Sequence, residues 1–313
     1  MFGFSWKRLG IVAGLSLSLV AAGCGQDDTE ETTDNADNNG DNQTENTANI
    51  GEAIEYTITG IEPGAGITQA TDDALAEYEN LAGWEQENSS TAAMLTELGD
   101  AIDNEEPIVI AGWSPHYKFA KWDLKYLEDP KEVYGGVEEL TTLARKGLQE
   151  DMPEAYTILD RFKWEPEDME SVMLAAQDMD FEQAAQQWVD ENQETVAEWT
   201  DGVESVDGQA IELVLTPWDT ERASTNVVKL VLEEKGYDVT MTPVDPSVTF
   251  QAVATGDGDA TVAAWLPQTH GAFYEEHEGD FDDLGANLVG AKIGLVVPSY
   301  MEIDSIEDLE PAE

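Results

Sequence analysis

Cysteine and histidine are scarce in this sequence, and their scarcity excludes several kinds of site. Among 313 residues there is one cysteine, Cys24, which excludes a disulfide framework and any Cys-rich zinc or iron–sulfur centre. Three histidines, His116, His270 and His277, leave little material for a histidine-based metal site. We therefore expect neither a metal nor a cofactor.

Basic residues are scarce as well. The chain has 14 Lys+Arg against 67 Asp+Glu, a formal charge of −53. Such a surface repels phosphate backbones, which argues against a nucleic-acid-binding protein. It also repels itself unless salt screens the charges, so we expect a protein that faces brine, as in a halophilic organism. The 41% of apolar residues suffices for a packed core, and the length suggests one or two domains.

The first 24 residues have the pattern of a secretory signal. A basic pair, Lys7-Arg8, precedes the apolar run Leu9–Ala22, which is too short to span a bilayer comfortably. Small residues directly before Cys24 resemble a bacterial lipobox, although Ala21 stands where that motif usually has leucine. We expect residues 1–24 to be a signal peptide with a lipobox and Cys24 to be lipidated. The alternative is a plain signal peptide with an incidental cysteine.

Residues 25–52 are rich in Asn, Asp, Thr, Glu and Gln and contain almost nothing to bury. Such a segment cannot offset its ordering entropy, so we expect a disordered acidic tether. An anchor followed by a tether predicts an extracytoplasmic protein, held as a lipoprotein at the outer face of the cell membrane.

Two later segments share one pattern of strands and helices. The first starts with Tyr56–Gly66 and ends with the strand Ile108–Trp113, and the second starts with Ile211–Trp218 and ends with Thr261–Trp265. Each predicts a β-α-β-α-β unit of a parallel sheet. The other elements expected are helices at Gln69–Leu81, Thr91–Ile102, Ala223–Lys235 and Val248–Thr255, and strands at Trp84–Glu87 and Tyr237–Thr242.

The remaining segments are expected to connect these units. Residues Tyr134–Trp199 have helical, amphipathic periodicity, with breaks at Pro153 and Pro166. The segments Trp122–Pro130 and Gly294–Pro298 are each long enough to cross between lobes as a two-stranded hinge.

The predicted fold is therefore α/β with two lobes, each a mainly parallel sheet flanked by helices. Lobe 1 is expected to comprise residues 53–118 and 293–313, and lobe 2 residues 119–292.

Tryptophan stands at three predicted strand ends, Trp113, Trp218 and Trp265. In open α/β sheets, ligands bind outside the carboxyl ends of strands, so these side chains are expected to face one cleft. Three indoles together predict an aromatic box for a quaternary ammonium, which has no proton to donate and is held by ring faces. The alternative is that the tryptophans pack in the core.

A Gly-rich turn, Glu62–Ile67, supplies a second candidate element. Free amides at the start of the following helix, with glycines that allow close approach, can bind an anion. Beside a cation box, a carboxylate is the better candidate than a phosphate. His270 could donate to it as well, although a helix-capping or solvent-facing histidine is the alternative.

Several strings resemble the glycine betaine-binding proteins of ABC importers. They are Ile61–Ile67, Ala111–His116, Leu124–Pro130, Pro217–Thr225 and Ala264–His270. The resemblance covers essentially all of residues 58–309 and implies a periplasmic-binding-protein-like fold of type II. It further implies that the quaternary ammonium lies among Trp113, Trp218 and Trp265, and that the carboxylate binds the amides of Gly66 and Ile67 and the His270 side chain. His116 is not a ligand contact by this resemblance.

The expected function is capture of glycine betaine, and of related betaines, for delivery to an ABC transporter permease in osmoprotection. One alternative is a protein that binds choline or another quaternary amine, for which Asp219 and Glu221 are the carboxylates to watch. A hydrolase built on Ser114 and His116 is a weaker alternative, because the Gly-x-Ser-x-Gly nucleophile pattern is missing.

Overall fold

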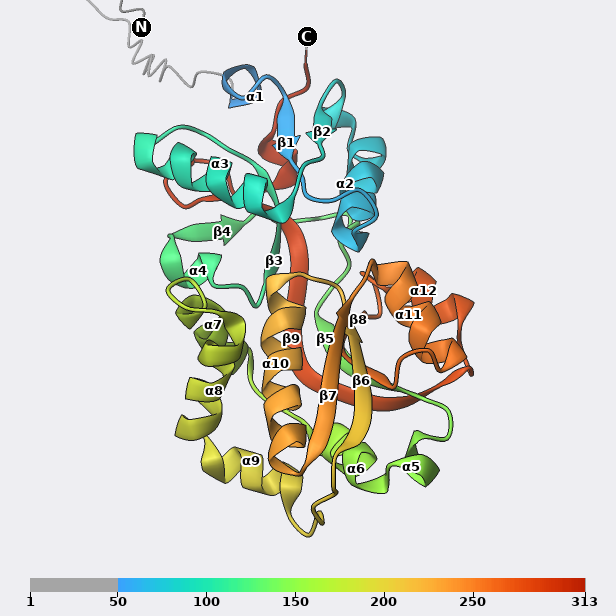
Figure 1. The fold of residues 1–313 in the computed structure, drawn as a ribbon. Coiled ribbons are helices and arrows are strands. Elements are labelled where there is room, and N and C mark those ends of the chain that lie inside the picture. Colours follow the sequence, from blue (N-terminus) through green and yellow to red (C-terminus); the bar gives the residue numbers. More distant parts are fainter. Residues whose placement is uncertain (1–49, 313) are drawn as a thin grey trace, which may run out of the picture. The chain divides into compact units, whose positions relative to one another are not determined.

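The computed structural model describes residues 50–312, and these contain two β-α-β-α-β units (Figure 1). The first unit follows a short helix, α1 (Ile50–Ala53), which begins inside the predicted tether. Its elements are β1 (Thr57–Thr59), α2 (Gly66–Glu77), β2 (Glu85–Glu87), α3 (Thr91–Asn104) and β3 (Ile110–Ser114), with a 3-10 turn at Glu79–Leu81. The strands are parallel in the order β2-β1-β3, so the first strand lies in the middle.

The second unit repeats this arrangement. It consists of β6 (Gln209–Leu215), α10 (Asp219–Glu234), β7 (Tyr237–Pro243), α11 (Pro246–Thr255) and β8 (Ala260–Leu266). The parallel order is β7-β6-β8, again with the first strand in the middle. Residues 260–265 of β8 are all buried, because α10 and α11 both pack against this strand. The predicted equivalence of the two units is confirmed in topology.

One long strand, β9 (Phe281–Pro298), runs through both lobes. Its first part pairs with β5 (Glu138–Arg145), and its last part pairs with β3 and with β4 (Leu124–Tyr126), always antiparallel. Figure 1 shows β9 as the red strand that continues from the second unit into the first. The predicted two-lobe α/β class is confirmed, with a mixed rather than mainly parallel sheet, since the parallel strands of each unit are extended by antiparallel partners.

The helical prediction for residues 134–199 is wrong at its start, where β5 is a strand. Leu140 and Leu143 are three positions apart, a spacing that is also found on one face of a helix. Here they belong to a strand that is hydrogen-bonded on both sides, to β8 and β9, and both side chains are fully buried. The rest of the segment is helical. It forms α5 (Leu148–Asp151), α6 (Pro153–Arg161), α7 (Pro166–Ala175), α8 (Phe181–Glu191) and α9 (Gln193–Thr200), so each predicted proline break is the first residue of a helix.

The crossing from the first lobe to the second also differs from the prediction. The short helix α4 (Lys118–Lys121) precedes β4 in the chain. Residues 124–126 of β4 then pair with the last part of β9, which also pairs with β3. Tyr134 still donates its hydroxyl hydrogen to Thr71 of α2. These contacts favour a crossing after Tyr134 instead of within Trp122–Pro130, whereas the domain boundaries themselves stay a prediction.

Near the end of the chain lie the short helix α12 (Gly271–Glu276) and a 3-10 turn at Ile306–Asp308. Within residues 50–312, no helix is both long and apolar enough to cross a membrane. The predicted signal peptide, Cys24 and most of the predicted tether lie outside the described residues.

Candidate functional site

One small cavity between the two units brings together six of the predicted site residues. They are Trp113, Trp218, Trp265, Gly66, Ile67 and His270. The cavity measures about 30 Å³, and its other walls come from residues that include Ala65, Thr220 and Glu221. Cys24, the seventh predicted residue, lies outside the described part of the chain. The structure therefore places every described candidate at one location.

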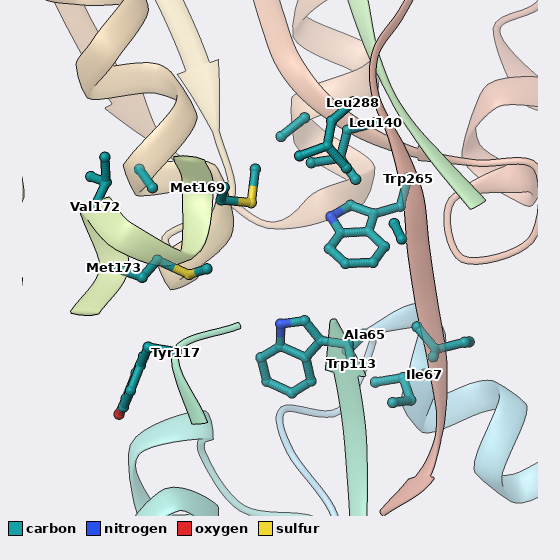
Figure 2. Packing of buried hydrophobic residues seen from close by; sticks show 14 of the residues in the cluster. Ala65, Ile67, Trp113, Tyr117, Leu140, Met169, Val172, Met173, Trp265 and Leu288 are labelled. Atoms are coloured by element: carbon teal, nitrogen blue, oxygen red, sulfur yellow. The ribbon is translucent and has the colours of Figure 1, made fainter. Parts of the chain in front are cut away.

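Trp113 and Trp265 occupy equivalent places, at the carboxyl ends of β3 and β8. Both are buried, with 6% and 3% of their surface exposed, although each stands at a strand end. Figure 2 shows the Trp265 ring above the Trp113 ring, with Ala65 and Ile67 beside Trp113. Indoles from two different units thus form two walls of one cavity.

Two of the three indoles donate their N–H to a carboxylate. Trp265 donates from Nε1 to Glu221 Oε1 at 3.2 Å, and both residues belong to the second unit. Trp218, the residue that precedes α10, donates from Nε1 to Glu62 Oε2 at 3.2 Å, which links the second unit to the first. These bonds satisfy the polar edge of each ring and fix its orientation, which leaves the ring surface for the cavity.

Trp113 is held in another way, by the buried side chain of Lys118. Its Nζ donates to the Trp113 carbonyl oxygen at 2.6 Å and lies 3.9 Å from the centroid of the indole ring. Burial lowers the pKa of Lys118 well below its usual range, and nearby Asp219 and Glu170 only partly oppose this shift. The amine therefore contacts the indole inside the protein and fixes the ring from behind the cavity wall.

Glu221 is the acidic residue in the cavity wall. Its Oε2 accepts a hydrogen bond from Thr220 Oγ1 at 2.5 Å, and Oε1 accepts from Trp265. Burial raises the pKa of this carboxyl to about 7, against the opposing effect of these hydrogen bonds. A positive charge beside this buried carboxyl would favour its ionised form.

Another part of the cavity wall is formed by the start of α2. The amides of Gly66 and Ile67 occupy the first two helical positions, where no carbonyl one turn earlier can accept them. The turn before them is closed by Glu62, whose carbonyl accepts from Ala65 N at 3.2 Å and from Thr68 Oγ1 at 2.9 Å. No acidic residue stands in the first turn of α2, so its positive end is open to an anion.

Gly66 also permits a close contact between the two lobes. A Cβ built on this residue would lie 2.0 Å from the carbonyl oxygen of Thr269, which follows β8 in the second unit. Any other residue would force these two backbone segments apart. The Thr269 segment is itself fixed by buried Glu138, which accepts from the amides of Gln268 at 2.8 Å and Thr269 at 2.7 Å.

His270 presents a hydrogen-bond donor that lacks an acceptor. Its Nδ1 accepts from the backbone N–H of Trp265 at 3.0 Å, so the ring proton is on Nε2. Burial lowers the pKa of His270 to about 3, which keeps the ring neutral. Within residues 50–312, no group accepts from the buried Nε2. A buried donor without a partner at a cavity wall indicates a place for a ligand oxygen.

The alternative catalytic pair is not assembled. Ser114 accepts its hydrogen bond from the Tyr126 hydroxyl at 3.0 Å, and His116 Nδ1 accepts from the Lys118 amide at 3.1 Å. His116 Nε2 lies 3.7 Å from an Asp219 carboxylate oxygen. Within the described residues, no group of three His, Cys, Asp or Glu side chains is arranged to hold a metal ion.

Sequence reasoning missed the supporting roles of Glu62, Lys118 and Glu138. Glu62 and Glu138 act through contacts between segments far apart in the chain, such as the 131 positions that separate Glu138 from Thr269, whereas Lys118 contacts Trp113 five positions before it. No local motif marks such residues. Glu221 was predicted only as a residue to watch, and the structure places it in the cavity wall.

A family model described as the substrate binding domain of ABC-type glycine betaine transport systems matches residues 32–191 and 209–313. The chain belongs to this family. The chain is also 50% identical over 268 residues to the glycine betaine/carnitine transport binding protein GbuC of Listeria monocytogenes, across 85% of this chain and 89% of that protein. The predicted family is thereby confirmed, and membership makes this chain an extracytoplasmic substrate-binding protein of an ABC transport system.

Two solved structures are similar to parts of this substrate-binding protein. Lactococcal OpuAC, closed and complexed with glycine betaine, is 44% identical, with a TM-score of 0.44 over 48% of this chain and 59% of that one. The glycine betaine, L-proline-binding protein ProX of Borrelia burgdorferi is 33% identical, with a TM-score of 0.45 over 49% of this chain and 58% of that one. Both matches span less than two thirds of the solved chains.

Proposed function

We propose that this binding protein captures glycine betaine in the cavity between its lobes. The quaternary ammonium would lie among Trp113, Trp218 and Trp265, where ring faces attract a cation that cannot donate a hydrogen bond. The carboxylate would accept from the amides of Gly66 and Ile67 and from Nε2 of His270. Binding and release, with no chemical step, are the whole of its activity.

The unpaired donor on His270 is the observation that carries this proposal. Its Nε2–H is buried and lacks an acceptor within residues 50–312, in a cavity whose other walls include three indoles. Leaving such a donor unsatisfied costs about 1–3 kcal/mol, which a ligand carboxylate would recover. A ligand with both a methylated cation and an anion satisfies the two ends at once.

Calorimetry with glycine betaine, choline, carnitine and glycine tests the ligand class. We expect glycine betaine to bind most tightly, because choline lacks the carboxylate and glycine lacks the methyl groups. Carnitine carries the same two charges farther apart, so it tests how strictly the site fixes the separation of the two charges. Tighter binding of choline than of glycine betaine would contradict the carboxylate subsite.

Choline or another quaternary amine remains the second candidate, because Glu221 lies in the cavity wall. A ligand with a net positive charge would favour the ionised form of this carboxyl. Choline binding should then weaken as the pH falls below about 7, the pKa to which burial raises Glu221. The same titration with glycine betaine provides the comparison.

We also propose that the mature chain is a lipoprotein that delivers betaine to an ABC permease for osmoprotection in a saline habitat. The support is the sequence: an apolar signal ending at Ala22-Gly23-Cys24 and a charge of −53. Mass spectrometry of the membrane-bound protein should find a diacylglyceryl modification on Cys24. The Cys24→Ser chain should be released into the medium, and a wild-type chain without lipid would contradict the anchor.

A further inference from the structure

Glu62 connects the two ends of the site. Its backbone carbonyl closes the turn that presents the amides of Gly66 and Ile67, through bonds from Ala65 and Thr68. Its side chain accepts from Trp218 Nε1 at 3.2 Å, on the other side of the cleft. Glu62, in the first unit, therefore contacts both the turn that presents the Gly66 and Ile67 amides and Trp218, one of the three indoles proposed to form the cation cage.

The Glu62 carboxylate is held in place independently of Trp218. Its Oε1 accepts from the Thr91 amide at 2.9 Å, and its Oε2 accepts from Thr91 Oγ1 at 2.9 Å. Thr91 is the first residue of α3, so the positive end of this helix stabilises the negative charge. If the lobes separate, the bonds from Thr91 would keep the acceptor on the first lobe, while Trp218 would move with the second.

Trp218 lies between two spaces of very different size. On one side is the site cavity of about 30 Å³, and on the other is a groove of about 690 Å³ between the lobes, lined among others by Glu62, Thr91, Tyr117 and Asp219. The indole is only half-buried, unlike Trp113 and Trp265. It is therefore the cage wall that faces the open groove.

We propose that Glu62 and Trp218 form a latch that keeps the occupied cage closed, so that ligand leaves into the groove when this hydrogen bond breaks. This proposal rests on the function proposed above. The Trp265–Glu221 bond is the internal comparison, since it joins the same two chemical groups within one unit and does not break when the lobes separate. Glu62 is thus a positioning residue that acts on the lifetime of the complex.

Stopped-flow fluorescence with glycine betaine tests the latch through a double-mutant cycle. Glu62→Gln places an amide donor beside the indole N–H, and Trp218→Phe removes that N–H but keeps a ring. We expect Glu62→Gln to raise the dissociation rate about tenfold, with association changed less than about twofold, as for the loss of one charge-assisted hydrogen bond. In the Trp218→Phe chain the same substitution should have no further effect, whereas in the Trp265→Phe chain the tenfold increase should persist.

A second measurement does not depend on ligand binding. Spin labels at Thr96→Cys on α3 and Gln183→Cys on α8, in a Cys24→Ser chain, report the distance between the lobes. We expect Glu62→Gln to increase the fraction of separated lobes. If wild type fails to bind glycine betaine and this shift still occurs, the proposed function is wrong and the latch stands. Equal distance distributions in wild type and in the Glu62→Gln chain, or an equal rate increase in the Trp218→Phe chain, would overturn the latch.

Discussion

The two β-α-β-α-β units share one strand order, yet their first helices begin in opposite ways. Helix α2 starts at Gly66 after a Gly-rich turn and has no acidic residue in its first turn. Helix α10 starts directly after Trp218 and has Asp219 and Glu221 in its first turn. The first turn of the first helix therefore lacks carboxyl groups in one unit and carries two of them in the other.

In the function proposed above, this difference would separate the two charges of the zwitterion. The N-terminus of a helix has a partial positive charge, which at α2 is available to an external anion. At α10 the chain's own carboxyl groups compensate it, so a cation can lie nearby beside Trp218. In that proposal, one architecture used twice would supply an anion-binding end and a cation-binding end, which differ in the residues of a single helical turn.

The largest expected effect on ligand affinity comes from adding a side chain at Gly66, the first residue of α2. In a Gly66→Ala chain the new Cβ would lie 2.0 Å from the Thr269 carbonyl oxygen, so the lobes could not approach fully. We expect calorimetry to show at least about a hundredfold weaker binding of glycine betaine, because both ends of the site depend on that approach. The melting temperature without ligand should not fall, since alanine is a better helix former than glycine.

Gly136→Ala is the matched control for Gly66→Ala. A Cβ at Gly136 would meet no atom within 4 Å, so its affinity should equal that of wild type. Wild-type affinity in the Gly66→Ala chain would mean that the lobes need not come this close to hold the ligand.

The next effect separates the tryptophans of the cage from those of the core. Trp265→Ala should weaken glycine betaine binding about 10–100-fold, because a ring face and its buried area are lost. Trp199 packs instead against Phe162 and Trp188, with ring centroids 5.0 and 5.9 Å away. Trp199→Ala should lower the free energy of unfolding by about 3–5 kcal/mol. Calorimetry and urea unfolding of both chains measure the contrast, and unchanged affinity in Trp265→Ala would remove this residue from the site.

A smaller effect is expected from Glu221 of α10, on the free energy of unfolding. Burial raises the pKa of Glu221 to about 7, so the folded chain binds its proton more tightly than the unfolded chain does. Its stabilising contribution is complete below the unfolded pKa of about 4.3 and is lost as the pH rises through about 7. Between pH 5 and 7 this amounts to about 2 kcal/mol.

Urea unfolding of wild type and Glu221→Gln at several pH values measures this contribution. The glutamine chain should lack the decrease in stability between pH 5 and 7 that Glu221 causes. His270 changes stability in the opposite direction, because burial lowers its pKa to about 3. Its contribution to the free energy of unfolding is lost as the pH falls from 6.5 towards 3. The two chains must therefore be compared at each pH. Parallel pH profiles for both chains would contradict a raised pKa for Glu221.

Much of the site could be predicted from sequence because its residues stand at local landmarks. Trp113 and Trp265 end apolar runs of strand length, and Gly66 begins a helix after a glycine-rich turn, patterns that do not depend on distant contacts. The topology then brings equivalent strand ends together. All six described candidates accordingly line one cavity.

The residues that hold the site together could not be predicted in this way. The helical prediction for residues 134–199 includes Glu138, because leucines three positions apart in β5 are also compatible with a helix. Only the pairing of β5 with β8 and β9 makes this segment a strand. The Glu62–Trp218 bond joins residues 156 positions apart. Such contacts depend on the arrangement of the lobes, which local periodicity does not report.

The smallest effect distinguishes two histidines in equivalent positions. His116 and His270 follow Trp113 and Trp265, are both buried, and each accepts a backbone N–H at Nδ1. Only His270 lines the cavity; His116 Nε2 lies 3.7 Å from Asp219 instead. His270→Asn should weaken glycine betaine binding about tenfold, the value of one hydrogen bond to a charged group.

His116→Asn should change affinity less than about twofold, because it alters a buried contact away from the cavity. Calorimetry of both chains at one pH between 5 and 8 suffices, since burial keeps His270 neutral, with a pKa of about 3, across that range. Melting temperatures show whether either substitution unfolds the protein. Equal losses of affinity in both chains would mean that the donor on His270 acts through folding and not through the ligand. A tenfold loss of affinity in the His270→Asn chain alone would show that only the histidine of the second unit donates a hydrogen bond into the cavity. The two units would then differ at this position, as they do in the first turns of α2 and α10.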